Sequence, residues 1–249
     1  MKESKSWQRF NGKIRNLKQY LQLMDLTLKI SNSQCIKQKN VNLKICDALG
    51  ASTQSHKQLN IPNTTNEIRR VYVSTRKSLN EQAFVELHCI FSDYISHIIS
   101  EIAHNDPKKL LGIMGDSSER TICYADIVKL GNYELIINEM ATKVFRFLEN
   151  LRSTSKMLEK LCKITKISIK ESLKNEASIY VDVRHLIIHG DSIVDENFIK
   201  RDVHKLIPLK GNKLALKYEV TDKAINKIYE FCKVLDDALI EKGVLPIRK

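Results

Sequence analysis

Residues 180–197, YVDVRHLIIHGDSIVDEN, begin with an apolar run that holds four charged or imidazole side chains before it ends at Gly190. The four side chains are those of Asp182, Arg184, His185 and His189. Ionisable groups are costly to bury unless they are paired with one another or with polar neighbours. A helix with this sequence therefore either pairs these side chains within the fold or uses them in chemistry.

Imidazole and guanidinium groups together are what metal-free cleavage of RNA needs. That reaction requires a base for the 2′-hydroxyl proton, an acid for the 5′-oxygen and a cation for the charge that develops on the phosphate. Histidine titrates near neutrality and can be either base or acid. Arginine offers a planar fork of donors to a phosphate and keeps its charge when it is buried. Phosphodiester chemistry on RNA is therefore one interpretation of this segment.

Two other interpretations stay open. In the first, Asp182 pairs with Arg184 or His185, and the cluster only stabilises the fold, as structural ion-pair networks do. In the second, His185 and His189 bind a metal ion together with a carboxylate, since two histidines four residues apart can ligate one ion. The segment HLIIH lacks the glutamate that follows the first histidine in metallohydrolase helices. No cysteine or second carboxylate cluster lies nearby, so the metal interpretation is the weaker one.

Helix geometry distributes the four side chains over two sides of the segment. At about 100° per residue, Asp182, His185 and His189 share one stripe, while Arg184 lies about 140° from His189. The valine, leucine and isoleucine residues around them point in nearly every direction, which is typical of a buried, central helix. Gly190 is expected to end this helix in a left-handed turn and to leave His189 at its terminus.

Apolar residues that recur at steps of three and four predict long amphipathic helices on both sides of the segment. The expected helices cover residues 4–30, 80–106, 132–151, 156–164, 168–190 and 222–243. Ser78 or Asn80, Ser168 and Thr221 are expected to begin three of them. In the helix before Pro107, we expect the histidines to be surface or capping residues; they are His88, His97 and His104.

The remaining patterns complete the predicted fold. Two alternating runs within residues 204–220 surround a Gly-Asn pair and predict a small β-hairpin. Residues 51–65 are polar and turn-forming, so they predict a linker. The predicted fold class is all-α, a bundle of at least four long helices with a small C-terminal β-hairpin. We expect an N-terminal helical extension, residues 1–65, followed by a helical bundle domain, residues 66–249.

The composition limits the class of protein and the kind of partner. The chain has 249 residues, of which 43% are hydrophobic and 28% charged, and this balance is typical of globular proteins. Its formal net charge of +12 fits a polyanionic partner, because lysine and arginine near phosphates release condensed counterions, and on charge alone it fits a role in solubility equally well. The basic residues are spread over several clusters, which suits a folded basic surface better than a disordered arm.

Cysteine usage and hydropathy predict where the protein acts. The six cysteines form no CxxC pair, so we expect them to be reduced, as in intracellular proteins. The first residues, MKESKSWQRF, lack the apolar core of a signal peptide. No window approaches the roughly 18 apolar residues of a membrane helix. The sequence therefore predicts a soluble, cytoplasmic protein without a membrane partner.

The segment RHLIIH resembles the Arg-x4-6-His signature of HEPN domains (higher eukaryotes and prokaryotes nucleotide-binding), in which a polar residue follows the arginine. Arg184, His185 and His189 occupy the signature positions. The setting is similar too, because the signature comes late in the chain, at the end of an apolar helix in a predicted helical bundle. The resemblance covers residues 66–245 and leaves the N-terminal 65 residues unexplained.

This resemblance implies a metal-independent endoribonuclease that leaves a 2′,3′-cyclic phosphate and needs no cofactor. It also implies a homodimer in which both motifs meet in one basic cleft that binds the RNA substrate. By the match, His189 is the general base or acid, Arg184 contacts the phosphate, and His185 orients the site or assists it. Asp182 is not part of the signature, and we expect it to support the site by orienting His185.

The resemblance also implies a biological setting and an alternative. HEPN nucleases are largely bacterial toxins and anti-phage defence effectors, so a cognate antitoxin protein is a further expected type of partner. Some HEPN domains lack activity. The alternative is therefore a non-catalytic RNA- or protein-binding helical module in which Arg184 and His189 hold the fold together. Retention of the full motif favours the nuclease.

Overall fold

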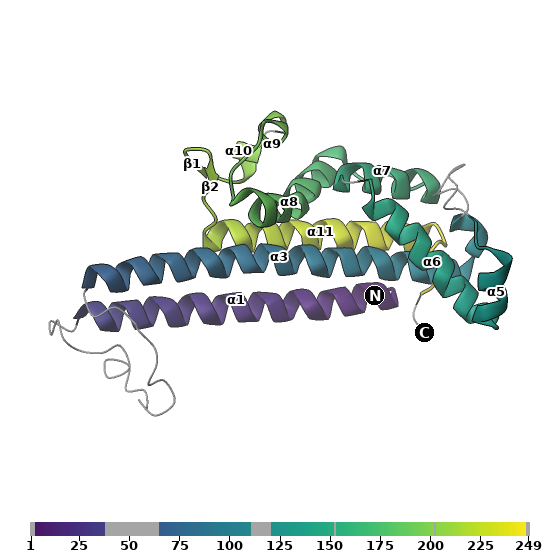
Figure 1. Ribbon diagram of the computed structural model, residues 1–249, viewed down its shortest axis with the longest axis horizontal. Coiled ribbons are helices and arrows are strands. Elements are labelled where there is room, and N and C mark those ends of the chain that lie inside the picture. Colours follow the sequence, from purple (N-terminus) through teal and green to yellow (C-terminus); the bar gives the residue numbers. More distant parts are fainter. Residues whose placement is uncertain (1–2, 38–64, 111–120, 152, 202, 248–249) are drawn as a thin grey trace, which may run out of the picture.

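The computed structural model describes residues 3–37, 65–110, 121–151, 153–201 and 203–247. The fold is all-α with one small antiparallel hairpin near the C-terminus, as predicted (Figure 1). Its longer helices are α1 (Lys5–Lys37), α3 (Thr65–Asn105), α6 (Tyr133–Glu149), α7 (Thr154–Thr165), α8 (Glu171–Gly190) and α11 (Tyr218–Glu241). The shorter elements are η1 (Pro107–Leu110), α5 (Tyr124–Leu130), α9 (Glu196–Lys200), α10 (Val203–Leu206), β1 (Leu209–Lys210) and β2 (Lys213–Leu214).

Two long antiparallel helices, α1 and α3, form the axis of the molecule. Figure 1 shows them side by side, with α11 along α3 and with α8, α7 and α6 covering the side of α3 that faces away from α1. The apolar stripe of α1, from Trp7 through Phe10 to Leu21, is buried in the same core as the stripes of α3 and α11. The helix of the predicted N-terminal extension therefore belongs to the common core. Residues 51–64 of the predicted linker lie outside the described residues, and residue 65, its predicted end, is the first residue of α3.

Two of the predicted helix caps instead join helices to each other. α3 already begins at Thr65 and α11 at Tyr218, so Asn80 and Thr221 lie inside their helices. Both side chains are buried, and the Thr221 hydroxyl donates to Asn80 Oδ1 at 2.8 Å. The predicted starts are wrong because these polar residues satisfy each other across the α3–α11 contact. Sequence alone gave no sign of that partnership.

The predicted β-hairpin is present and lies directly after the motif helix and its short successors. Leu209 pairs with Leu214, and Lys210 pairs with Lys213, in antiparallel register. Gly211 has a positive φ of 63°, a conformation that glycine adopts without steric cost. The hairpin is also bonded to the chain that leaves α8, because the Val194 amide donates to the Asn212 carbonyl at 2.8 Å.

A buried carboxylate fixes the start of α1 against α11. Ser4 precedes the helix, and its hydroxyl accepts the Trp7 amide at 2.9 Å, which is an N-cap contact. The same hydroxyl donates to Asp236 Oδ1, and the Ser4 amide donates to Asp236 Oδ2 at 3.3 Å. Asp236 is fully buried in α11. This contact ties the two ends of the chain together.

Replacing Asp236 by asparagine is expected to change how the free energy of unfolding varies with pH. Burial raises the pKa of the Asp236 carboxyl above its ordinary value of 3.8, although the hydrogen bonds from Ser4 oppose the shift. On folding, this carboxyl therefore takes up a proton at pH values between its ordinary and its raised pKa. Its contribution to stability is fully present below the ordinary pKa and is lost as pH rises through the raised one.

Urea unfolding of wild type and Asp236→Asn, from about pH 4 to about pH 8, measures this effect. The stability of the wild type relative to the variant should fall as pH rises across this range, because asparagine does not titrate. A difference in the free energy of unfolding between wild type and variant that stays constant with pH would contradict the prediction.

Candidate active site at the end of α8

Helix α8 is buried along most of its length and emerges at its last turn. Ala177, Val181 and Val183 are buried against α3, α7 and α11. His185 and His189 are exposed, and so is Ile188, at 46%. The expectation of burial on all sides is therefore correct for the body of the helix and wrong for its end. The two histidines lie where solvent and a ligand can reach them.

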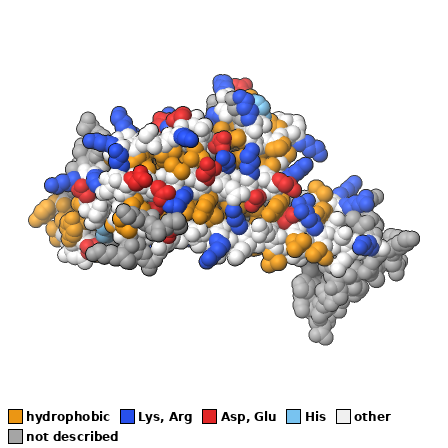
Figure 2. Space-filling view, turned by 180° about the vertical axis from the view of Figure 1, so that it is seen from behind, with side chains coloured by type: hydrophobic (Ala, Val, Ile, Leu, Met, Phe, Trp, Pro, Cys, Tyr) orange, Lys and Arg blue, Asp and Glu red, His pale blue; other side chains and the backbone are white. Residues whose placement is uncertain are grey.

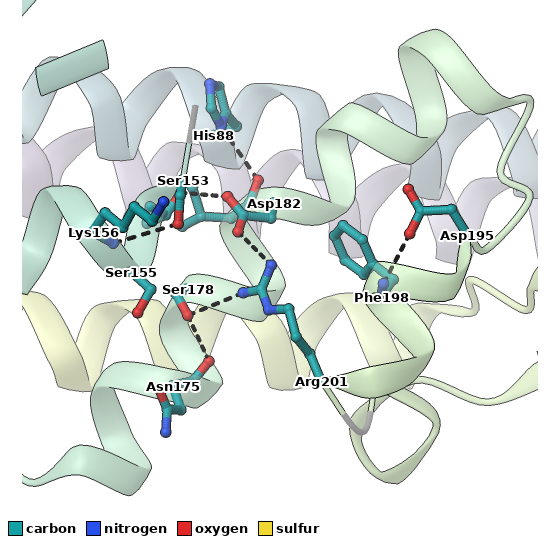
Figure 3. Close-up of polar contacts among 12 residues, drawn as sticks. His88, Ser153, Ser155, Lys156, Asn175, Ser178, Asp182, Asp195, Phe198 and Arg201 are labelled. Carbon is teal, nitrogen blue, oxygen red and sulfur yellow. Dashed lines mark hydrogen bonds and ion pairs between the residues drawn. The ribbon is translucent and has the colours of Figure 1, made fainter. Parts of the chain in front are cut away.

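The polar residues in the body of α8 are paired with distant parts of the chain. Arg201 Nη1 lies 2.7 Å from Asp182 Oδ2, and Arg201 Nη2 donates to Ser178 Oγ at 3.2 Å. The Thr154 hydroxyl donates to the other oxygen of Asp182. Figure 3 shows the Arg201 guanidinium between Ser178 and Asp182, which lie one turn apart on the same stripe of the helix.

This network corrects the predicted role of Asp182. Its two oxygens bind Arg201 and Thr154, and among the described residues neither bonds to Arg184 or His185. The expected Asp182–His185 contact is wrong because Arg201 follows α9 and reaches back over α8. Sequence reasoning missed both partners of Asp182. Nothing local marks them, since Thr154 lies on another helix and Arg201 lies beyond the helix end.

The three signature residues behave differently from Asp182. Within the described residues, the side chains of Arg184, His185 and His189 form no hydrogen bond or ion pair. The rings of His185 and His189 are in contact, with centroids 5.0 Å apart and planes at 48°. Arg184 is half-buried on another side of the helix. The structure thus brings the two histidines together, and it leaves Arg184 apart from His189 within one chain.

A strained turn holds the end of the motif helix. Gly190 is still helical, and the left-handed residues are Asp191 and Ser192, with φ of 49° and 62°. The predicted left-handed glycine is therefore wrong by one residue. Left-handed residues other than glycine are disfavoured and persist only where surrounding contacts impose them.

Those contacts come from α8 itself, from α3 and from the hairpin. The buried Ser192 side chain donates to Glu81 Oε1 at 2.6 Å, and the Ser192 amide donates to the Leu186 carbonyl at 2.9 Å. The Ser192 carbonyl accepts the Leu214 amide at 2.9 Å. Lys213 Nζ lies 2.7 Å from Asp191 Oδ2. The last turn of α8, which carries His189, is thereby fixed in place.

One of the α3 histidines faces the motif helix rather than solvent. His88 is half-buried, and its Nδ1 lies 3.3 Å from the Val181 carbonyl of α8 (Figure 3). His97 and His104 instead bond to the carbonyls of Asp93 and Ser100 on their own helix. The prediction of surface or capping roles is thus wrong for His88 and consistent with the contacts of the other two.

One whole face of the molecule carries both signs of charge. Figure 2 shows lysine and arginine side chains spread over the face seen from behind, with acidic side chains between them. In the described parts of the chain, no group of three or more His, Cys, Asp or Glu side chains is arranged to hold a metal ion. Nor is any helix in those parts both long enough and apolar enough to span a membrane.

Comparison of the chain with protein-family models, with curated proteins and with solved structures found no match.

Proposed function

We propose that the protein is a metal-independent endoribonuclease of HEPN type, which cleaves RNA by attack of the 2′-hydroxyl and leaves a 2′,3′-cyclic phosphate. One contrast within α8 carries the proposal. Ser178 and Asp182 are bonded into the fold, whereas the three signature residues have no hydrogen-bond or ion-pair partner among the described residues. The two histidines are exposed, and Arg184 is half-buried without a partner in the described ranges that would offset its burial, so these side chains are available to a ligand rather than committed to the fold.

The residue types fit the steps of this reaction. Arg184 offers guanidinium donors to the phosphate and to the charge that develops on it. His189 acts as general base or acid, and His185, whose ring contacts that of His189, orients or assists it. The reaction needs no cofactor. The net charge of +12 draws the polyanionic substrate toward the protein.

The separation of Arg184 and His189 around the helix supports a second part of the proposal, a homodimer. On a straight helix the two side chains point about 140° apart, so one copy alone aims them poorly at a single phosphate. A second copy that faces the first across a two-fold axis brings Arg184 of one protomer toward His189 of the other. We place the active site at that dimer interface. The proposed setting is a cytoplasmic toxin or anti-phage defence effector, with a cognate antitoxin as a possible partner.

The test is incubation of the purified protein with total RNA and with a tRNA pool in excess EDTA. We expect cleavage that persists in EDTA and leaves 2′,3′-cyclic phosphate ends, which end-group analysis by mass spectrometry detects. Cleavage that EDTA stops would point to metal chemistry and contradict the mechanism. RNA binding without cleavage would leave the non-catalytic binding module as the function.

A further inference from the structure

His88 lies at the point where α3 contacts the motif helix. Three apolar residues close to it on α3 are fully buried, Phe84, Leu87 and Phe91, whereas Val85 and Ser92 are half-buried. The imidazole is the polar group of this stretch that faces α8, and it reaches the Val181 carbonyl at 3.3 Å. An imidazole in an apolar contact between helices needs a reason beyond packing, because a leucine fills the same space without a polar cost.

Its hydrogen bond does not supply that reason. In an α-helix the carbonyl of residue i accepts the amide of residue i+4, so the Val181 carbonyl already has the His185 amide as donor. His88 is therefore not needed to satisfy the backbone of α8. What the bond does is join His88 to the turn of α8 that carries Arg184 and His185.

The bond also selects the tautomer of His88. A carbonyl oxygen only accepts, so Nδ1 of His88 carries the hydrogen that is donated to Val181. In the neutral ring, Nε2 then has a free lone pair. Within the described residues, Nε2 has no hydrogen-bond partner. The geometry therefore presents an unprotonated imidazole nitrogen beside the signature turn.

The surroundings keep this imidazole neutral. Burial lowers the pKa of His88 below its ordinary value of 6.5, and the nearby Arg184 cation lowers it further. The bond to Val181 and the carboxylates of Asp182 and Glu149 oppose the shift without cancelling it. These are the charged groups that face His88 from α8 and α6. At pH 7 the ring is thus a free base, which is the state that a general base needs.

We infer that His88 is the general base of the cleavage reaction, an assignment that rests on the function proposed above. Its Nε2 takes the proton of the 2′-hydroxyl, and the 2′-oxygen bonds to phosphorus. The bond from phosphorus to the 5′-oxygen breaks, and that oxygen receives a proton from the His185–His189 pair. Arg184 stabilises the charge on the phosphoryl oxygens. One proton is taken up and one is released, and the products are a 2′,3′-cyclic phosphate and a 5′-hydroxyl.

His88→Asn tests this role, because the asparagine amide can still donate to the Val181 carbonyl but cannot act as a base. We expect kcat to fall by about 10²–10⁴-fold, with RNA affinity and melting temperature near those of the wild type. In the wild type, kcat/KM should rise with pH as His88 loses its proton. That acidic limb should be absent from the residual activity of the variant. His97→Asn, on the same helix, is the matched control and should cleave like the wild type.

A second measurement keeps the inference testable if His88→Asn folds poorly. Nitrogen NMR of the wild-type imidazoles should show His88 neutral at pH 7 and protonated at Nδ1. The chemical shift of Nε2 should change when an uncleavable 2′-deoxy oligonucleotide binds. Full activity in a folded His88→Asn protein, beside an inactive Arg184→Ala protein, would overturn the role of His88 and leave the proposed function standing. Absence of cleavage by the wild type would instead overturn the proposed function, and the role of His88 with it.

Discussion

His189→Ala and Arg184→Ala are each expected to abolish RNA cleavage and to leave the folded protein intact. Loss of a positioned acid or base costs about 10²–10⁴-fold in rate, and loss of a donor to developing charge costs about 10²–10³-fold. Neither side chain has a hydrogen-bond or ion-pair partner among the described residues. Substitution of an exposed residue such as His189 usually changes the free energy of unfolding by no more than about 0.5 kcal/mol, and for the half-buried Arg184 we expect a smaller loss than for Asp182→Ala. Cleavage assays beside urea unfolding measure both effects.

Asp182→Ala is the contrasting variant on the same helix. It removes the carboxylate that Arg201 and Thr154 share and leaves Arg201 with Ser178 alone as a hydrogen-bond partner among the described residues, so we expect a loss of about 1–3 kcal/mol in the free energy of unfolding. His204→Ala, in α10, controls for the loss of an exposed histidine that has no hydrogen-bond or ion-pair partner among the described residues. If His189→Ala and Arg184→Ala lost as much stability as Asp182→Ala, the signature residues would belong to the structural network.

Trp7→Ala is expected to destabilise the whole protein, because α1 belongs to the common core. The Trp7 side chain is 1% exposed, and its ring lies 5.6 Å from that of Phe10 and 5.0 Å from that of Tyr229 on α11. Truncation of a buried tryptophan costs about 3–5 kcal/mol, through lost transfer energy and the cavity that remains. Urea unfolding followed by circular dichroism should show the entire transition at lower denaturant concentration.

The chain contains one tryptophan, so tryptophan fluorescence reports on the packing of α1 against its neighbours. In the wild type, the unfolding transitions by fluorescence and by circular dichroism should coincide, as they do for a single cooperative unit. Lys5→Ala, which removes an exposed side chain from the same helix, should leave both unchanged. A fluorescence transition at a lower urea concentration than the circular dichroism transition would mean that α1 unfolds separately from the rest, as expected for an extension.

The long helices could be predicted from sequence because their apolar stripes are regular. In α3 the stripe from Phe84 through Phe91 to Ile98 is buried as its spacing predicts. The helix starts could not be predicted in the same way. Asn80 and Thr221 have good capping side chains, and only the packing of α3 on α11 reveals that they bond to each other instead.

The candidate site was predictable in its residue types and not in its partners. The motif itself locates Arg184, His185 and His189, and the period of the helix gives their directions. The partner of Asp182 depends on how Arg201 returns over α8, which is a property of the tertiary fold. His88 lies far from the motif in sequence, and a lone histidine in an apolar stripe carries no local signal of its neighbour. Contacts between distant segments are what sequence periodicity leaves undetermined.

During synthesis on the ribosome, the end of α8 cannot take its final shape until the hairpin has emerged. The left-handed pair Asp191 and Ser192 is unfavourable on its own, and Lys213 and Leu214 supply part of what holds it. A nascent chain that stops before these residues carries the signature without its fixed last turn. The protein is proposed to cut RNA, and while it is synthesised beside ribosomal RNA and messenger RNA its proposed active site is incomplete. The order of the chain thus delays completion of the proposed site until the hairpin has been synthesised.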